Sequence, residues 1–227
     1  MIGIIGGSGL YKGIPGFEGE ERIIETPYGD VRIIQGKKFV FLSRHGDPPK
    51  PPHMINYHAN IKAFEILHVK KIIAISSVGS LRKDIPVGSI IMPTNLLDFT
   101  HKVWTYRDDE PYHVNMYEPF CKELRDKIKD ALQITIGGTY ATMKGPQFET
   151  GAEANMLRIL GADVVGMTVA PEAKLAKELN LCYQPICIVV NYVDEKTTHQ
   201  ATLKGMKNVE EEIRRMVKVL INGYSIK

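Results

Sequence analysis

The chain has 227 residues, 44% of them hydrophobic, which predicts a single domain over residues 1–227 rather than two domains. Its 29 Lys and Arg residues nearly balance 26 Asp and Glu residues, and no block of like charge could follow a nucleic-acid backbone, so no nucleic-acid partner is expected. The sequence contains neither a signal-peptide pattern nor a run of roughly 18 apolar residues that could span a membrane, and we expect a cytoplasmic protein with no membrane partner.

The cysteines indicate the same compartment. Cys121, Cys182 and Cys187 form no CxxC pair, and an odd number without the spacing of a disulfide framework is typical of an intracellular protein. We therefore expect three reduced thiols in the core, where cysteine packs as a small apolar residue.

Short β-branched runs alternate with longer segments of helical period. This alternation predicts the α/β class, with strands and helices interleaved around a central sheet. The expected strands cover residues 3–5, 31–35, 39–43, 71–76, 89–92, 138–143, 163–167 and 183–190.

Two helix starts carry the spacing of a capping box. Thr150 stands three residues before Glu153, so each side chain can bind a backbone N–H of the other residue, and a helix is expected through Leu160. Asn208 and Glu211 repeat this spacing before an apolar stripe of helical period, which predicts a second helix there.

Proline marks other boundaries. Pro119 can occupy the first turn of a helix, with three leucine and isoleucine residues facing inward: Leu124, Ile128 and Leu132. Residues 47–53 (DPPKPPH) are too rich in proline for a helix or sheet interior and predict an exposed loop. Residues 101–117 are aromatic, charged and aperiodic, and this length is typical of a functional loop.

Small donors and cations follow three of the expected strands. In residues 6–9 (GGSG), backbone N–H groups and the Ser8 hydroxyl could approach an anion, although the same glycines also suit an ordinary tight turn. Arg44 and His45 close the expected strand 39–43, either as an anion site or as a surface arginine beside a structural histidine. Residues 76–80 (SSVGS) follow a third strand. Because α/β proteins bind ligands at strand ends, we interpret these segments as one oxyanion site.

Two further segments could bind a flat heterocycle. Phe148 can stack on a planar base, and Glu149 can accept a hydrogen bond from a purine ring N–H. Asn191 follows an apolar strand and carries both a donor and an acceptor for a purine edge. Each of these residues alone is better explained as a core aromatic, a solvated acid or a turn asparagine. The first glycine turn also lacks GxGxxG spacing, which disfavours a dinucleotide-binding enzyme.

These segments, in this order, resemble the trimeric family of purine nucleoside phosphorylases and methylthioadenosine phosphorylases over nearly the whole chain. The matching pieces are IGIIGGSGL, TPYGD, RHG, INYHANI, SSVGSLR, EPFC, GPQFET, GADVVGMT and PE. The resemblance implies a central mixed sheet with a smaller barrel-like sheet, a homotrimer or a dimer of trimers, and a role in purine salvage. It also implies that phosphate replaces the purine at C1′ of a nucleoside, with no metal or organic cofactor.

By matching position, the resemblance implies a role for each candidate residue. Asn191 and Glu149 would be the catalytic residues and would read the base beside Phe148, while Met167 and His113 would contact the ribose, His113 in the site of a neighbouring subunit. Phosphate would be bound by Ser8, Arg44, His45, Ser77, Val78 and Thr168.

The base pocket departs from the adenine-cleaving relatives, which carry a hydroxyl residue at the position of Glu149 and an aspartate at that of Asn191. An amide can donate to O6 or N7, and a carboxylate can accept the N1–H that hypoxanthine and guanine have and adenine lacks. We therefore expect a 6-oxopurine substrate, with 5′-methylthioinosine as the best single choice. Inosine, guanosine and methylthioadenosine are alternatives, as is a non-catalytic nucleotide-binding module. The loop after Arg44 is shifted relative to the family, and His53 is given no role.

Overall fold

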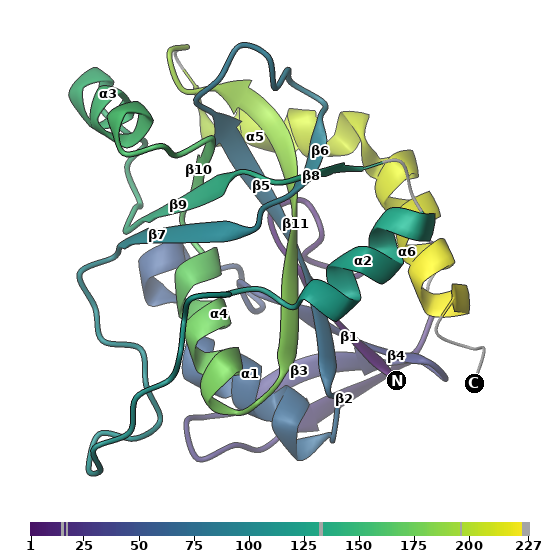
Figure 1. The fold of residues 1–227 in the computed structure, drawn as a ribbon. Helices are drawn as coiled ribbons and strands as arrows, with labels where there is room; N and C mark the ends of the chain where they lie inside the picture. Colours follow the sequence, from purple (N-terminus) through teal and green to yellow (C-terminus); the bar gives the residue numbers. More distant parts are fainter. Residues whose placement is uncertain (15, 17, 132–133, 196, 224–227) are drawn as a thin grey trace.

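The computed structural model describes residues 1–14, 16, 18–131, 134–195 and 197–223. Within them, the strands form one connected mixed sheet with helices on both faces (Figure 1). The strands are β1 (Ile2–Gly6), β2 (Glu20–Ile24), β3 (Val31–Gln35), β4 (Phe39–Ser43), β5 (Lys71–Ser80), β6 (Ile90–Met92), β7 (Asn95–Phe99), β8 (Thr135–Ile136), β9 (Thr139–Met143), β10 (Val164–Gly166) and β11 (Cys182–Tyr192). The helices are η1 (Pro52–Met54), α1 (Tyr57–Ile66), α2 (Lys122–Ala131), α3 (Gly151–Ile159), α4 (Val169–Glu178), α5 (His199–Asn208) and α6 (Glu210–Gly223).

Four parallel strands form the centre of the sheet. β1 pairs with β4 on one side and with β5 on the other, and β5 pairs along its length with β11. The last residues of β5 also pair with β10, which continues the sheet through β9 to β7. Because the four central strands are parallel, their carboxyl ends meet at one edge of the sheet, where α/β proteins bind ligands.

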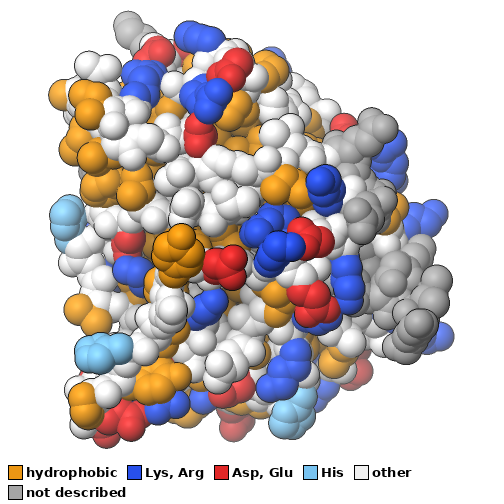
Figure 2. Space-filling view, in the orientation of Figure 1, with side chains coloured by type: hydrophobic (Ala, Val, Ile, Leu, Met, Phe, Trp, Pro, Cys, Tyr) orange, Lys and Arg blue, Asp and Glu red, His pale blue; other side chains and the backbone are white. Residues whose placement is uncertain are grey.

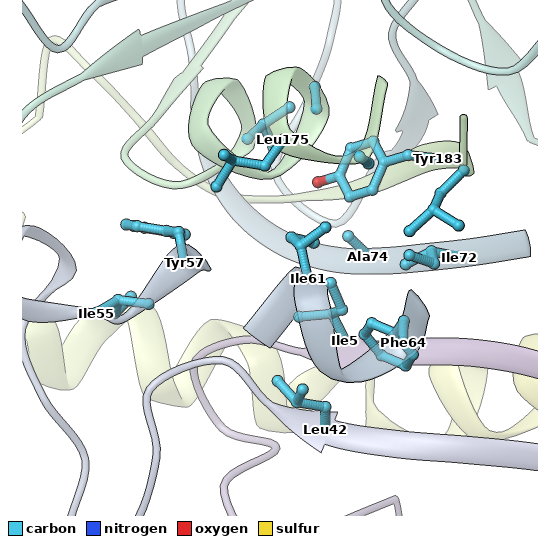
Figure 3. Close-up of a cluster of buried hydrophobic side chains, with 14 of the residues drawn as sticks. Ile5, Leu42, Ile55, Tyr57, Ile61, Phe64, Ile72, Ala74, Leu175 and Tyr183 are labelled. Carbon is cyan, nitrogen blue, oxygen red and sulfur yellow. The ribbon is translucent and has the colours of Figure 1, made fainter. Parts of the chain in front are cut away.

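Alternate side chains of the central strands enter apolar cores on opposite faces of the sheet. On one face, Ile5 and Ala74 pack with Ile61 and Phe64 of α1 and with Leu175 of α4 (Figure 3). On the other face, Ile4 of β1 and Ile73 and Ile75 of β5 share a core with three helices. The helices contribute Leu124 from α2, Met206 from α5 and Ile213 from α6. Burial on both faces explains the continuous apolar runs of these strands. Polar residues therefore follow the strands at their ends, at the edge of the sheet.

The expected α/β class with a mixed central sheet is confirmed, and each expected strand is present. The strand expected at 71–76 is longer, since β5 continues to Ser80, so Ser77 and Val78 lie within a strand rather than after one. Pairing with both β10 and β11 outweighs the turn tendency of the serines and glycine there. Three strands were not expected from the sequence: β2, β7 and β8.

The helix starts were predicted with mixed success. The capping box of α3 is confirmed, because Glu153 N donates to Thr150 Oγ1 at 3.2 Å and Thr150 N donates to the Glu153 carboxylate at 2.8 Å. The expected cap at Asn208 is wrong, since this residue ends α5 and α6 begins two residues later. An N-cap is instead present at the start of α5, where Thr198 Oγ1 accepts a hydrogen bond from Ala201 N at 3.1 Å.

The expectation for Pro119 is also wrong, because α2 begins only at Lys122 and the proline precedes its first turn. Leu124 and Ile128 are buried as predicted, and Leu132 lies outside the described residues. The proline-rich segment 47–53 is a largely exposed loop with a short 3₁₀ turn at its end, and 101–117 contains no helix or strand, both as expected.

The expectation of three reduced thiols is wrong for two of them. Cys121 and Cys182 form a disulfide across 61 residues of sequence. The fold brings them together, because Cys121 N donates to Tyr183 O at 2.9 Å and so aligns the residue before α2 with the start of β11. Cys187 is a free, buried thiol as predicted. The disulfide removes the cysteine argument for a reducing compartment.

The surface agrees with the near-balanced charge. In Figure 2, basic and acidic side chains are interspersed, and hydrophobic side chains gather at the upper left, where Figure 1 places α3. Ile159 and Leu160, at the end of α3, are 83% and 51% exposed. No helix among the described residues is long and apolar enough to cross a membrane.

The disulfide predicts a stability effect. A double Cys121→Ser, Cys182→Ser variant should lose about 2–4 kcal/mol of unfolding free energy, because the crosslink restricts the unfolded chain over a long loop. Denaturant unfolding with and without dithiothreitol measures this loss. The reductant should destabilise the parent protein and leave the double variant unchanged; equal stability of both proteins under oxidising conditions would contradict the assignment.

Candidate active site

A cavity of about 430 Å³ opens at the carboxyl edge of the central strands. This volume is in the range of small-molecule binding sites. It is lined by ten of the residues singled out from sequence: Ser8, Arg44, His45, Ser77, Val78, Phe148, Glu149, Met167, Thr168 and Asn191. The structure therefore brings together the expected anion-binding and base-binding residues, which come from six separate stretches of chain.

His113 lies elsewhere. It lines a second cavity with Tyr112, Lys177 and the disulfide, apart from the ten residues above. Trp104, in the same irregular segment, packs edge-on against Tyr57 of α1 with ring centroids 5.2 Å apart. Neither residue lines the cavity that holds these ten residues.

Arg44 enters the cavity from the end of β4 and is almost wholly buried. Its Nε donates to Glu172 Oε1 at 2.5 Å, its Nη2 to Glu172 Oε2 at 3.1 Å, and its Nη1 to the carbonyl of Ile75 at 3.0 Å. A guanidinium carries five N–H groups, so these three bonds leave two for a ligand. Burial acts to lower the pKa of Arg44, but the Glu172 carboxylate outweighs it and raises the pKa, so the side chain stays charged.

Glu172 is the buried partner of this arginine. It is 0% exposed in the first turn of α4 and also accepts a hydrogen bond from Tyr183 Oη of β11 at 2.6 Å. A carboxylate this deep is tolerated because it is paired and hydrogen-bonded. Glu172 belongs to the PE pair of the sequence, but no role for it could be predicted, because it lies 128 residues from Arg44 and carries no local signal.

The glycine turn after β1 is shaped around the arginine. A Cβ on Gly7 would lie 2.5 Å from Arg44 Nη1 and 2.8 Å from the carbonyl of Ile75, so only glycine fits. The turn thereby brings Ser8 to the wall of the cavity beside the guanidinium.

His45 is neutral in this environment. Burial lowers the pKa of His45 to about 4, and the positive charge of Arg44 acts in the same direction. Its Nδ1 lies 2.8 Å from the carbonyl of Lys50. Since a carbonyl only accepts, Nδ1 carries the proton and Nε2 is left as an acceptor.

Hydroxyl groups and a helix terminus complete this end of the cavity. Thr168 is the N-cap residue of α4, yet its side chain makes no capping hydrogen bond. The N-terminus of a helix favours an anion, because its first N–H groups point outward and the helix dipole is positive there. Ser77 and Val78 line the same wall from β5. The arrangement suits an oxyanion.

The other end of the cavity carries the aromatic ring and the acid. Phe148, in the turn before α3, is 45% exposed and lines the cavity beside Glu149. Burial raises the pKa of Glu149 above its ordinary value, and the nearby Glu153 acts in the same direction. The ring can stack on a flat ligand, while the ionised acid can only accept a hydrogen bond.

Asn191 reaches the cavity through an irregularity in β11. The pairing of β11 with β5 shifts between Val189 and Asn191, which places Asn191 opposite Gly79. Its Nδ2 donates to the carbonyl of Tyr192 at 3.0 Å. One N–H and the amide oxygen therefore remain for a ligand.

Several lining residues were missed from the sequence. They are Tyr11, Lys50, His199 and Thr202, of which the last two lie on α5. The N-cap residue Thr198 was the signal for α5, but no residue pattern placed this helix over the cavity. Among the described residues, no group of three or more His, Cys, Asp or Glu side chains is placed to hold a metal ion.

Similarity to known proteins extends over nearly the whole chain. The family model described as "Phosphorylase superfamily" matches residues 1–222. The "Probable S-methyl-5'-thioinosine phosphorylase" of Methanothermobacter thermautotrophicus is 41% identical over 220 residues, covering 93% of this chain and 79% of the relative. The "6-oxopurine nucleoside phosphorylase" of Pyrococcus furiosus is 40% identical over 240 residues, covering 95% and 90%. The structure of methylthioadenosine phosphorylase from Schistosoma mansoni with adenine superposes with a TM-score of 0.92 at 26% identity, covering 100% of this chain and 92% of the other.

The packing of the glycine turn can be tested directly. Gly7→Ala should lower the unfolding free energy by about 1–3 kcal/mol, since the added methyl group must displace Arg44 or the β5 backbone. Gly151→Ala is the matched control, because a Cβ at this first residue of α3 meets nothing within 4 Å. Denaturant unfolding of both variants decides; equal stabilities would show that Arg44 does not pack against the turn.

Proposed function

The chain belongs to the phosphorylase superfamily, and we propose that it is a phosphate-dependent purine nucleoside phosphorylase with 5′-methylthioinosine as its preferred substrate. The products are then hypoxanthine and 5-methylthioribose 1-phosphate. The observation that carries this proposal is a single cavity with an oxyanion-binding end, formed around Arg44, and a base-reading end, formed by Glu149 and Asn191.

At the oxyanion end, inorganic phosphate is the co-substrate in this proposal. The two unused N–H groups of Arg44, the hydroxyls of Ser8, Ser77 and Thr168 and the backbone at Val78 are suited to its oxygens. The neutral His45 can accept a hydrogen bond from a protonated phosphate oxygen through Nε2. No organic cofactor or metal takes part.

At the base end, the donor and acceptor pattern favours a 6-oxopurine. Asn191 has a free amide N–H for O6 or N7, and an ionised Glu149 accepts the N1–H of hypoxanthine. Neutral adenine has no N1–H, so its binding would leave the carboxylate without a partner, an unfavourable arrangement in a half-buried site. Phe148 stacks on the base and Met167 lies against the ribose in this proposal.

The reaction follows from these roles. The bond between C1′ and the purine nitrogen lengthens, so positive charge develops on the ribose and negative charge on the departing purine. Asn191 stabilises the purine by donating to N7 or O6 as charge gathers there, and the bound phosphate stabilises the ribose and then bonds to C1′. Phosphate is held beside the sugar before reaction, which replaces a random encounter by an oriented attack.

The names of the relatives support the same substrate class and suggest alternatives to 5′-methylthioinosine. Inosine and guanosine are the alternatives suggested by the 6-oxopurine relative, and methylthioadenosine by the superposed structure.

We also propose a homotrimer, in which His113 of one subunit reaches the site of the next. Supporting this, Val103 and Tyr117 of the same segment are 82% and 89% exposed, as expected for side chains that a neighbouring subunit covers.

The substrate proposal predicts a pattern of products. With phosphate present, methylthioinosine should release hypoxanthine at the highest kcat/KM, inosine at a lower value and methylthioadenosine at least roughly 100-fold more slowly, because adenine leaves Glu149 unpaired. Chromatography of the free base, with and without phosphate, measures this. Base release without phosphate would contradict phosphorolysis, binding without any release would favour a nucleotide-binding module, and adenine released fastest would overturn the specificity.

The acid at the base end predicts a pH dependence. Because burial raises the pKa of Glu149, lowering the pH should protonate it before an exposed glutamate, and kcat/KM for the 6-oxopurine nucleoside should fall through that raised pKa. Glu149→Gln should be less active and should lack this acidic limb. Since phosphate titrates equally for both proteins, the ratio of their profiles isolates Glu149; a ratio that stays constant with pH would show that Glu149 does not bind the base in its ionised form.

A further inference from the structure

The oxyanion end of the cavity is poorer in positive charge than its residues suggest. The charge of Arg44 is balanced at short range by Glu172, and both side chains are at most 2% exposed. His45 is neutral at physiological pH, because burial lowers its pKa to about 4. A phosphate dianion entering this site would meet donors and a helix terminus but little net positive charge.

Lys50 lines the same cavity, from the proline-rich loop that follows β4. Of the lysine and arginine side chains that line the cavity, within the part of the chain that the structure describes, Lys50 is the one without an ion pair. The nearest acid along the loop, Asp47, is already engaged, since its Oδ2 accepts from Arg32 Nη1 at 2.8 Å.

The backbone fixes where this lysine stands. Lys50 N donates to the carbonyl of His45 at 2.9 Å, and His45 Nδ1 donates back to the carbonyl of Lys50 at 2.8 Å. Pro49 precedes it and Pro51 follows it, so the backbone on both sides of Lys50 is restricted to few conformations. The reciprocal bonds therefore hold the base of the lysine side chain beside His45, at the oxyanion end of the cavity.

We infer that Lys50 is a phosphate-binding residue, which supplies the net positive charge that the Arg44–Glu172 pair does not. This inference rests on the proposed function for the identity of the anion. An ammonium group on a flexible stem can follow the phosphate as it moves toward C1′, whereas the buried guanidinium is held by its three hydrogen bonds.

The test compares Lys50→Gln with Lys50→Arg and with the control Lys12→Gln. Lys12 is an exposed lysine that, like Lys50, lines the adjoining cavity, but unlike Lys50 it does not line the site itself. Its loss changes the net charge of the protein equally. Lys50→Gln should raise KM for phosphate about ten-fold to a hundred-fold, with KM for the nucleoside nearly unchanged at saturating phosphate. Lys50→Arg should restore most of the phosphate affinity, and Lys12→Gln should match the parent protein.

A binding measurement separates this inference from the proposed function. Inorganic phosphate should raise the melting temperature of the parent protein and of Lys12→Gln, and the shift should be much smaller for Lys50→Gln. If the parent cleaves no nucleoside, the proposed function fails, and the melting shifts still decide the role of Lys50. Equal phosphate KM values or equal shifts for the two glutamine variants would overturn the inference, as would the absence of any phosphate-induced shift in the parent.

Discussion

The structure depends most on one buried ion pair. Arg44 comes from the end of β4 and Glu172 from the first turn of α4, and Tyr183 of β11 donates to the same carboxylate. Neither charge could lie in this core alone, so β4, α4 and β11 must all be in place before either is satisfied. The pair therefore couples the packing of α4 on the sheet to the geometry of the cavity. The fold itself orients Arg44, because Glu172 and the carbonyl of Ile75 hold its guanidinium.

This coupling has an electrostatic consequence. Because Glu172 balances the charge of Arg44, the proposed phosphate would be bound by directed N–H and O–H groups and by the N-terminus of α4, and its net positive counter-charge would come from Lys50. Such a site selects an anion by shape and by the number of its acceptors. At the opposite end, Glu149 and Asn191 line the cavity with one acceptor and one donor, the pattern that the proposed function assigns to recognition of the base.

Much of this could be predicted from residues close together in sequence. The strands with β-branched runs, the capping box of α3 and the small or charged residues at strand ends are local signals, and the ten cavity residues followed from them and from the family resemblance. What was missed is non-local. The Cys121–Cys182 bond, the role of Glu172 and the continuation of β5 through Ser80 each depend on partners far away in the chain. β2 is a mostly exposed, charged edge strand, whose sequence EERII has no alternating pattern.

A crystal structure of the protein with phosphate and hypoxanthine tests the central claim most directly. The account predicts phosphate within hydrogen-bond distance of the Arg44 guanidinium, the Ser8 turn and Thr168, with Arg44 still paired to Glu172. It also predicts hypoxanthine against Phe148, with its N1–H on Glu149 and its O6 or N7 on Asn191. Phosphate bound away from Arg44, or a base seated without contact to Glu149 and Asn191, would contradict it.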